Sequence, residues 1–361
     1  MVGQPAPAGT GELSAVSCAD AVHCWAVGVP GPNESATATA AATVIVATAN
    51  AGATWTAQPV QSVGGSPAPA LTGISCPKVT VCMAVGSTGA DPGTGVVLTT
   101  DDGGSTWTAV TSPTGTVAVT SVQCSSAAKC SVLASDGTSI FTSSTVNFGR
   151  TWVQEGTLPA GLGGALDLWC GAGAGAGAAA ATCLVAGYTP TTAGHGQGTV
   201  ALSTDDGSTW TAATVPAGVG LLQAADCLTA TRCLAVGTTS NTVSDVVPAK
   251  GLVLASADGG HTWTTSTVSA SQPIDDIFAI DCPSATGCAM SGTQWSGSPA
   301  NGTGAVAESI NAGVTFAPST TAYAPLPLTS LACPTARFCA GVGGDTVARI
   351  TLSAPKKSSG G

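Results

Sequence analysis

Six side chains outside any repeated motif are candidates for binding or catalysis. They are Trp295, Tyr188, Asp275, Asp276, Asp91 and His195. Two carboxylates that meet across a fold, such as Asp275 and Asp91, could cleave a glycosidic bond, and an exposed indole such as Trp295 stacks on sugar rings. Equally, Trp295 could cover a loop, and Asp275 and Asp276 could form a polar turn. His195 lies in a glycine-rich segment without an evident partner, which argues against a catalytic base.

Fourteen cysteines mark the elements that would position these residues. They form seven pairs: Cys18–Cys24, Cys76–Cys82, Cys124–Cys130, Cys170–Cys183, Cys227–Cys233, Cys282–Cys288 and Cys333–Cys339. Successive first cysteines are 46 to 58 residues apart, a period typical of propellers and repeat arrays. A short hairpin brings such cysteines opposite one another, so we predict one disulfide per pair. Zinc would need converging soft ligands, and the chain has only three histidines; we predict no metal site and no cofactor.

The second repeat shows how each unit should fold. Alternation of apolar and small polar residues predicts a strand over Leu71–Cys76, and Cys82–Gly86 begins a second. Gly95–Thr99 predicts a third strand, and Trp107–Val110 a fourth. Four antiparallel strands in about 50 residues make a propeller blade. The sequence therefore predicts an all-β, seven-bladed propeller with four-stranded antiparallel blades and one disulfide in each.

A second motif follows the cysteines in six repeats, with the pattern Ser/Thr-x-Asp/Asn-x-Gly-x-Thr-Trp/Phe. Its acidic or amide positions are Asn50, Asp102, Asn147, Asp205, Asp258 and Asn311. An Asp or Asn side chain accepts backbone N–H bonds in a turn, and the glycine two residues later permits a positive φ. The aromatic ring then enters the next strand, where it can pack between blades.

This motif resembles the Asp-box, or BNR, repeat of sialidase-like propellers, over nearly the whole chain from about Leu13 to Leu352. The resemblance implies that each box is a structural hairpin between the third and fourth strands of a blade, away from the ligand face. The combination of Ser-Cys-x5-Cys-x-Ala-Val-Gly with a downstream box also resembles secreted or surface repeat proteins of actinobacteria.

The seventh repeat has three predicted strands and no box, so its fourth strand must come from elsewhere. Residues 4–6 resemble the end of a normal blade, and we predict that residues 2–8 complete the last blade and close the ring. We expect a single propeller domain over residues 1–355 and a linker or tag remnant over 356–361. No signal peptide precedes Val2, and we interpret the chain as a mature domain with an added start codon.

Blade geometry predicts which face of the disc carries function. The cysteine hairpins and boxes should share one face, and the loops between second and third strands and the inter-blade connections should share the other. The irregular segments expected there are 29–42, 87–94, 188–198, 238–250 and 293–304, with the connections 155–166 and 269–277. All six candidate residues lie in these segments.

Composition restricts the partners and the compartment. The net charge is −10 with only nine lysines and arginines, which argues against nucleic acid. No apolar run of 18 residues occurs, so we predict no membrane insertion. Fourteen paired cysteines favour an oxidising compartment, and thus a secreted or cell-surface protein. We expect a monomer whose partner is an extracellular glycan or protein.

Two functions remain open from the sequence. The favoured one is a non-enzymatic binding or scaffold propeller whose ligand contacts the irregular loops. The alternative is a glycoside hydrolase or lyase with a carboxylate pair. Sialidase activity is disfavoured, because the resemblance implies an arginine cluster and a Tyr–Glu pair, and the chain has four arginines and two tyrosines, neither of them near a glutamate in sequence.

Overall fold

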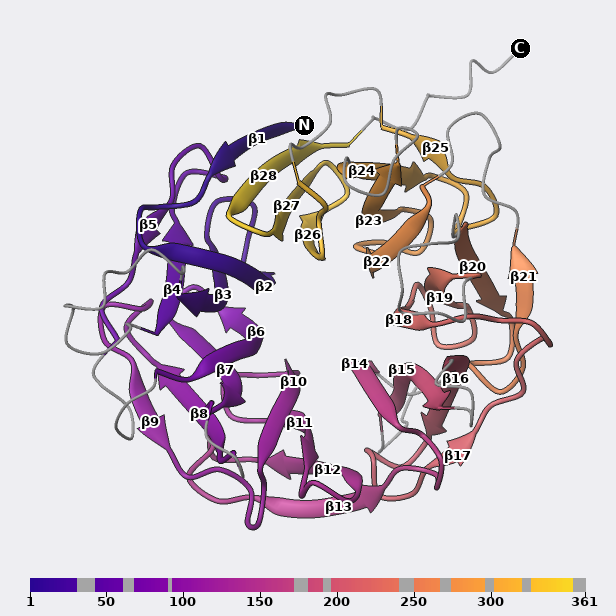
Figure 1. Cartoon of the computed structure of the whole chain (residues 1–361), viewed down its shortest axis with the longest axis horizontal. Coiled ribbons are helices and arrows are strands. Elements are labelled where there is room, and N and C mark those ends of the chain that lie inside the picture. The colour runs from indigo at the N-terminus through magenta and orange to yellow at the C-terminus, as the bar shows by residue number, and fades with distance from the viewer. Residues whose placement is uncertain are drawn as a thin grey trace.

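Seven four-stranded antiparallel sheets surround a central opening in the computed structural model of the chain (Figure 1). The structure describes residues 1–30, 43–60, 68–89, 93–171, 181–190, 196–239, 250–266, 274–295, 302–319 and 326–352. The predicted fold class is confirmed: the chain is a seven-bladed β-propeller.

In each blade the four strands are named below in their order from the central channel to the outer edge. Blade one consists of β2 (Thr10–Cys18), β3 (Cys24–Pro30), β4 (Val44–Thr48) and β5 (Thr56–Ala57). Blade two consists of β6 (Ala70–Lys78), β7 (Val81–Ser87), β8 (Gly95–Thr100) and β9 (Thr108–Val110). Blade three consists of β10 (Ala118–Cys124), β11 (Cys130–Ser135), β12 (Ile140–Thr145) and β13 (Val153–Thr157). Blades four and five consist of β14 (Gly164–Gly171), β15 (Thr182–Pro190), β16 (Gly196–Ser203) and β17 (Thr211–Ala212); and β18 (Leu222–Cys227), β19 (Cys233–Thr238), β20 (Gly251–Ser256) and β21 (Thr264–Ser266). Blades six and seven consist of β22 (Asp276–Asp281), β23 (Cys288–Trp295), β24 (Gly302–Ser309) and β25 (Ala317–Pro318); and β26 (Ser330–Thr335), β27 (Phe338–Gly343), β28 (Thr346–Thr351) and β1 (Val2–Pro5).

The hydrophobic core is divided among the seven seams between adjacent blades. Seven clusters of buried apolar side chains each join one blade to the next. In the cluster between blades one and two, Ile45 of β4 and Trp107 of the second box pack with Leu71 of β6. The middle strands are covered on both faces, so β8 is buried at every position. A sheet covered on both faces uses continuous apolar and small residues rather than strict alternation.

All seven predicted disulfides are present, one in each blade. Each joins the first and second strands, and the two Cα atoms lie 3.9 to 4.1 Å apart. In blade three, for example, Cys124 and Cys130 are direct cross-strand partners. The structure contains no free cysteine among the described residues. This disulfide content indicates an oxidising compartment.

The ring is closed by a strand from the opposite end of the chain. β1 pairs antiparallel with β28, and the register joins Val2 to Arg349 and Pro5 to Thr346. Figure 1 shows β1 along the outer edge of blade seven. The side chain of Met1 is buried in the cluster between blades six and seven. The expected domain boundary at residue 355 lies outside the described residues.

Each of the six boxes folds into the same hydrogen-bonded turn. The Ser or Thr hydroxyl that opens the box donates to Oδ1 of the Asp or Asn at 2.7 to 3.0 Å. That hydroxyl also accepts the glycine N–H, and Oδ1 accepts the N–H of the Thr four residues later. The residue before the glycine has a positive φ of 56° to 75° in every box, in addition to the glycine itself.

Hydrogen bonds tie each box to the cysteine hairpin of its own blade. The N–H of the residue before the box glycine donates to the carbonyl two residues before the second cysteine, at 2.8 to 3.2 Å in all six blades. In blade two, the N–H of Gly103 donates to the carbonyl of Thr80. Hairpins and boxes thus share one face of the disc, which we call the box face, and the opposite face is the loop face. Within the described residues, no helix is long and apolar enough to cross a membrane.

Candidate functional site

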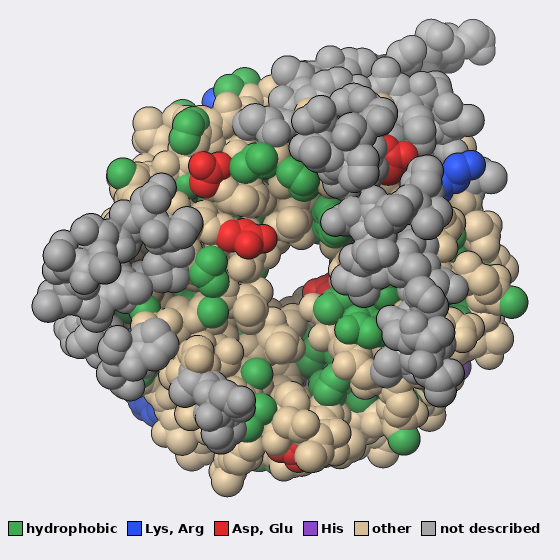
Figure 2. Space-filling view, viewed as in Figure 1, with side chains coloured by type: hydrophobic (Ala, Val, Ile, Leu, Met, Phe, Trp, Pro, Cys, Tyr) green, Lys and Arg blue, Asp and Glu red, His purple; other side chains and the backbone are tan. Residues whose placement is uncertain are grey.

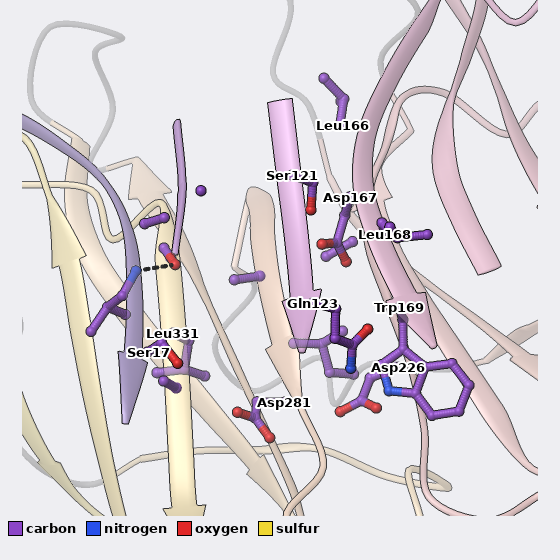
Figure 3. Close-up of a pocket in the computed structure, with 18 of the residues that line it drawn as sticks. Ser17, Ser121, Gln123, Leu166, Asp167, Leu168, Trp169, Asp226, Asp281 and Leu331 are labelled. Atoms are coloured by element: carbon purple, nitrogen blue, oxygen red, sulfur yellow. Dashed lines mark hydrogen bonds between the residues drawn. The ribbon is translucent and has the colours of Figure 1, made fainter. Parts of the chain in front are cut away.

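A central channel of about 760 Å³ is lined by the innermost strands of all seven blades. Its described lining consists mainly of small, hydroxyl and aliphatic side chains, with three carboxyl groups, Asp167, Asp226 and Asp281. Figure 3 shows these three carboxyl groups pointing into the channel from the sides of blades four, five and six. Figure 2 shows acidic side chains beside the opening on the visible face, with basic side chains toward the rim.

Every seam is closed at the channel by one side chain that accepts a backbone N–H of the next blade. In five seams the acceptor is the residue before the first cysteine, and the donor is the first cysteine of the next blade. Ser17 accepts from Cys76 at 3.0 Å, Ser75 from Cys124 at 3.0 Å, and Gln123 from Cys170. Asp226 accepts from Cys282 at 2.6 Å, and Asp281 from Cys333 at 2.8 Å.

In the other two seams, the acceptor and the donor both lie two residues earlier on their strands. Asp167 accepts the N–H of Ala225 at 3.2 Å, and Ser330 accepts the N–H of Val16 at 3.2 Å. The residue before the first cysteine is Trp169 in blade four and Ala332 in blade seven. Neither side chain has an oxygen acceptor. The residue two positions earlier, whose side chain points to the same side of the strand, accepts the N–H instead. Trp169 instead packs against the core cluster between blades four and five.

The protein environment makes the three channel carboxyl groups harder to ionise. Burial raises the pKa of Asp167 to about 6 and that of Asp281 to about 6. Burial, and then the nearby carboxylate of Asp281, raise the pKa of Asp226 well above its usual range. Desolvation disfavours a charged group, and a like charge adds to that effect. These three carboxyl groups therefore remain protonated in mildly acidic solution, in which an ordinary carboxyl group is already ionised.

A second hollow, of about 570 Å³, lies on the loop face between blades three and four. Its walls are Ser135 and residues 137–140, around the turn between β11 and β12, and the connection from β13 to β14, residues 157–165. Of the described residues that line it, none carries a charged or aromatic side chain. Thr120 contributes to the lining of both this hollow and the channel. We call this second hollow the blade 3–4 groove.

Tyr188 lies next to this groove. It pairs with Gly164 and Gly198 across β15, and its carbonyl accepts the N–H of Gly163 at 3.0 Å. Its ring occupies the space where side chains on Gly164 and Gly196 would stand. The half-buried phenol thus covers two glycines and holds one wall of the groove rather than presenting a fully exposed face.

The other sequence candidates are only partly described. Asp276 begins the innermost strand of blade six at its loop-face end, and Asp275 directly precedes it; the N–H of Asp275 donates to the carbonyl of Thr293 at 2.8 Å. They stand before the part of that strand that lines the channel, which begins at Phe278. Trp295 is the last residue of β23 and pairs with Gly302. Asp91 and His195 lie outside the described residues.

The sequence reasoning missed the channel carboxyl groups. Asp226 and Asp281 directly precede the first cysteine of their repeats, a position that is Ser17 and Ser75 in blades one and two. Aligning the seven repeats on their cysteines would have shown a polar, variable position on the innermost strand. Among the described residues, no three His, Cys, Asp or Glu side chains gather closely enough to hold a metal ion.

Solved structures with the same architecture have little sequence in common with this chain. Ycf48 bound to D1 peptide superposes with a TM-score of 0.63 at 12% identity, covering 98% of this chain and 97% of that one. Ycf48 from Cyanidioschyzon merolae gives 0.61 at 13% identity, covering 97% and 99%. The GH74 xyloglucanase from Xanthomonas campestris gives 0.65 at 14% identity, and this chain spans 98% of its own length but 55% of the xyloglucanase.

These likenesses establish the fold alone, because the identities are low. No protein-family model matches the chain, and no curated protein matches it in sequence. The chain is therefore similar to the propellers of Ycf48 and GH74 xyloglucanase in architecture.

Proposed function

We propose that this chain is an extracellular, non-enzymatic propeller of the Asp-box kind that binds a protein partner through its loop face. The observation that carries the proposal is the blade 3–4 groove, which opens on the face opposite the boxes and shares the lining residue Thr120 with the channel. Loops on a rigid scaffold are the usual place for binding. Residues 155–166, one of the connections that the sequence singles out, supply most of one wall.

The chemistry of the groove favours an uncharged, extended peptide segment. Its described lining offers the hydroxyl groups of Ser139 and Thr157 and apolar surface from Leu162. The hydroxyl groups of Ser135 and Thr138 also line it but already form hydrogen bonds within the turn. Hydroxyls pair with peptide amides, and the absence of charge among the described lining residues disfavours acidic or basic segments. Sugar sites normally include an aromatic platform, which the described lining lacks. The peptide seen on Ycf48 is consistent with this use of a propeller.

A filled groove tests this proposal. Ala160 is exposed on the groove wall, and A160W would place an indole in the hollow; Ala128 is exposed on the box face, so A128W is the matched control. We expect peptides selected from a random display library to bind wild type and A128W, and to lose at least about tenfold in affinity with A160W. Equal binding to A160W would refute the groove as the site.

The enzymatic alternative is tested in parallel. All three channel carboxyl groups, Asp167, Asp226 and Asp281, already accept backbone N–H groups in the seams, which favours a structural role for them. A screen of chromogenic glycosides should therefore show no turnover, and a glycan array should show no binding that A160W removes. Turnover that D275N or D276N abolishes would replace the binding proposal with glycoside hydrolysis.

A further inference from the structure

The seam acceptors differ in charge although they do the same job. Four seams use neutral groups, namely Ser17, Ser75, Gln123 and Ser330, and three consecutive seams use Asp167, Asp226 and Asp281. Each accepts one backbone N–H from the next blade. A hydroxyl or amide oxygen therefore suffices to close a seam, and the negative charge in blades four to six has no part in the closure itself.

The described strands around these three carboxyl groups carry no positive charge that could offset them. The strands packed against β14, β18 and β22 are β10, β11, β15, β16, β19, β20, β23 and β26. On these eleven strands the other titratable side chains outside disulfides are Tyr188 and Asp276, both toward the loop-face end of their strands. The described residues of these eleven strands include no Lys, Arg, His or Glu. The carboxyl groups thus face one another and neutral side chains across the channel.

Ionisation of these groups has opposing effects on the seams. A carboxylate is a stronger acceptor than a neutral carboxyl, which favours the charged form. Desolvation favours the neutral form of all three groups, and at Asp226 the carboxylates of Asp281 and Asp167 add repulsion; these effects prevail, because the pKa of each group is raised. The native state then binds protons more tightly than the unfolded chain. Stability therefore rises as pH falls from above 6 to about 4, and changes little from this source outside that window.

We propose that the three seams joining blades four to seven are acid-stabilised, whereas the other four seams are insensitive to pH. The acid-stabilised seams form one continuous arc of the ring, from β14 to β26 (Figure 1). In neutral solution this arc opens locally more often than the rest of the ring, and mild acidification removes the difference. The proposal concerns the ring itself and does not depend on what the loop face binds.

Amide hydrogen exchange measures each seam separately. The reporters are the bonded amides of Ala225, Cys282 and Cys333 in the arc and those of Cys76, Cys124 and Val16 elsewhere. After correction for intrinsic exchange, protection of the arc amides should rise on the order of tenfold or more between pH 7.5 and 4.5. Protection of the other three should stay within about threefold. Equal changes in both groups, or a loss in the arc, would overturn the proposal.

Exchanging the acceptor types tests the cause. D226N keeps an oxygen acceptor for Cys282 and removes the charge, so the pH dependence at Cys282 should disappear and protection at pH 7.5 should increase. S75D should create that dependence at Cys124, and S75N controls for side-chain size. If S75D does not fold at pH 7.5 but folds at pH 4.5, the proposal is supported; failure at both pH values leaves D226N decisive. A D226N protein with unchanged pH dependence at Cys282 would refute it.

Discussion

The guanidinium of Arg232 donates through Nε to the carbonyl of Ala312 at 2.6 Å, joining the cysteine hairpin of blade five to the box of blade six. Two other seams have a comparable link on the box face. The Trp25 indole donates to the carbonyl of Gly103 at 3.2 Å, and Lys129 pairs with Asp206 at 3.2 Å. In each case the side chain next to the second cysteine of one blade forms a hydrogen bond or ion pair with the residue before the box glycine of the next blade. The hairpins and boxes therefore hold blades to one another as well as closing each blade.

Removing the Arg232 link should weaken one seam measurably. R232M keeps much of the apolar stem and loses the donor, and we expect unfolding free energy to fall by about 1–2 kcal/mol, since bonds from charged groups contribute this much when partly buried. Thermal or denaturant unfolding measures the loss. Arg150 is exposed within the third box, so R150M is the matched control and should leave stability unchanged. An equal effect of both substitutions would contradict a specific role for the link.

The Asp-containing boxes should lose stability in acid, whereas the Asn-containing boxes should not. Hydrogen bonds from the backbone and hydroxyl of Thr106, and from the hydroxyl of Thr100, lower the pKa of Asp102 to about 2. Because the folded pKa lies below the ordinary value, this contribution is present above about pH 4 and is lost as pH falls toward 2.

Exchanging Asp and Asn between boxes tests this acid dependence. Asn50 and Asn147 form the same turn with a neutral amide. Their Nδ2 donates to the hydroxyl of the Thr four residues later, whereas in the second box the corresponding Thr hydroxyl donates to the carboxylate of Asp102. D102N should therefore fold normally and melt with a smaller dependence on pH between 2.5 and 4. N147D is the converse variant and should increase that dependence. Identical profiles for the two variants would show that the boxes do not titrate during folding.

The residue before each box glycine offers a test of backbone strain. Gly103 has φ +75° and Ala312 has φ +59°, in the left-handed region that costs a side chain about 1 kcal/mol. G103A should therefore destabilise the protein by about 1 kcal/mol, and a side chain there would also approach the carbonyl of Val79 at 3.3 Å. A312G should stabilise it by up to about 1 kcal/mol. Denaturant midpoints of the pair, which should move in opposite directions, provide the measurement.

Removing the closing strand should destabilise the whole ring. Deletion of residues 2–8 removes the four register pairs between β1 and β28 and exposes an unpaired edge. We expect the melting temperature to fall by about 5 °C or more, since several kcal/mol are lost and each shifts the melt of a large domain by about 2–4 °C. Deletion of residues 356–361 is the control. A synthetic peptide of residues 2–8 should restore part of the loss, and an unchanged melt would contradict closure by β1.

The architecture was predictable because its signals are local and repeated. Each cysteine pair marks a hairpin between neighbouring strands, and each box marks the next tight turn, so a single repeat such as residues 71–110 already describes a blade. Repetition of that unit seven times, with three strands in the last, then implies a closed ring. None of these steps requires knowledge of contacts between distant residues.

The channel was not predictable from a single repeat. Asp226 stabilises the structure through the amide of Cys282, 56 residues away, and this contact exists only after two blades have packed together. The shift of the acceptor from the position of Trp169 to Asp167 obscured the pattern further. The candidates Asp275 and Asp276 were chosen as carboxylates in an irregular segment, whereas the carboxyl groups with raised pKa values lie on the regular innermost strands.

The closing strand also sets an order of events during biosynthesis. Every disulfide joins cysteines 6 or 13 residues apart, so each blade can oxidise soon after it is made. β1 is synthesised before all of them, yet its partner β28 emerges only after residue 346. A chain truncated before that point keeps its disulfides but cannot complete its circle. Closure therefore requires that β28 has been made, because only then is the last strand edge of the ring hidden from other chains.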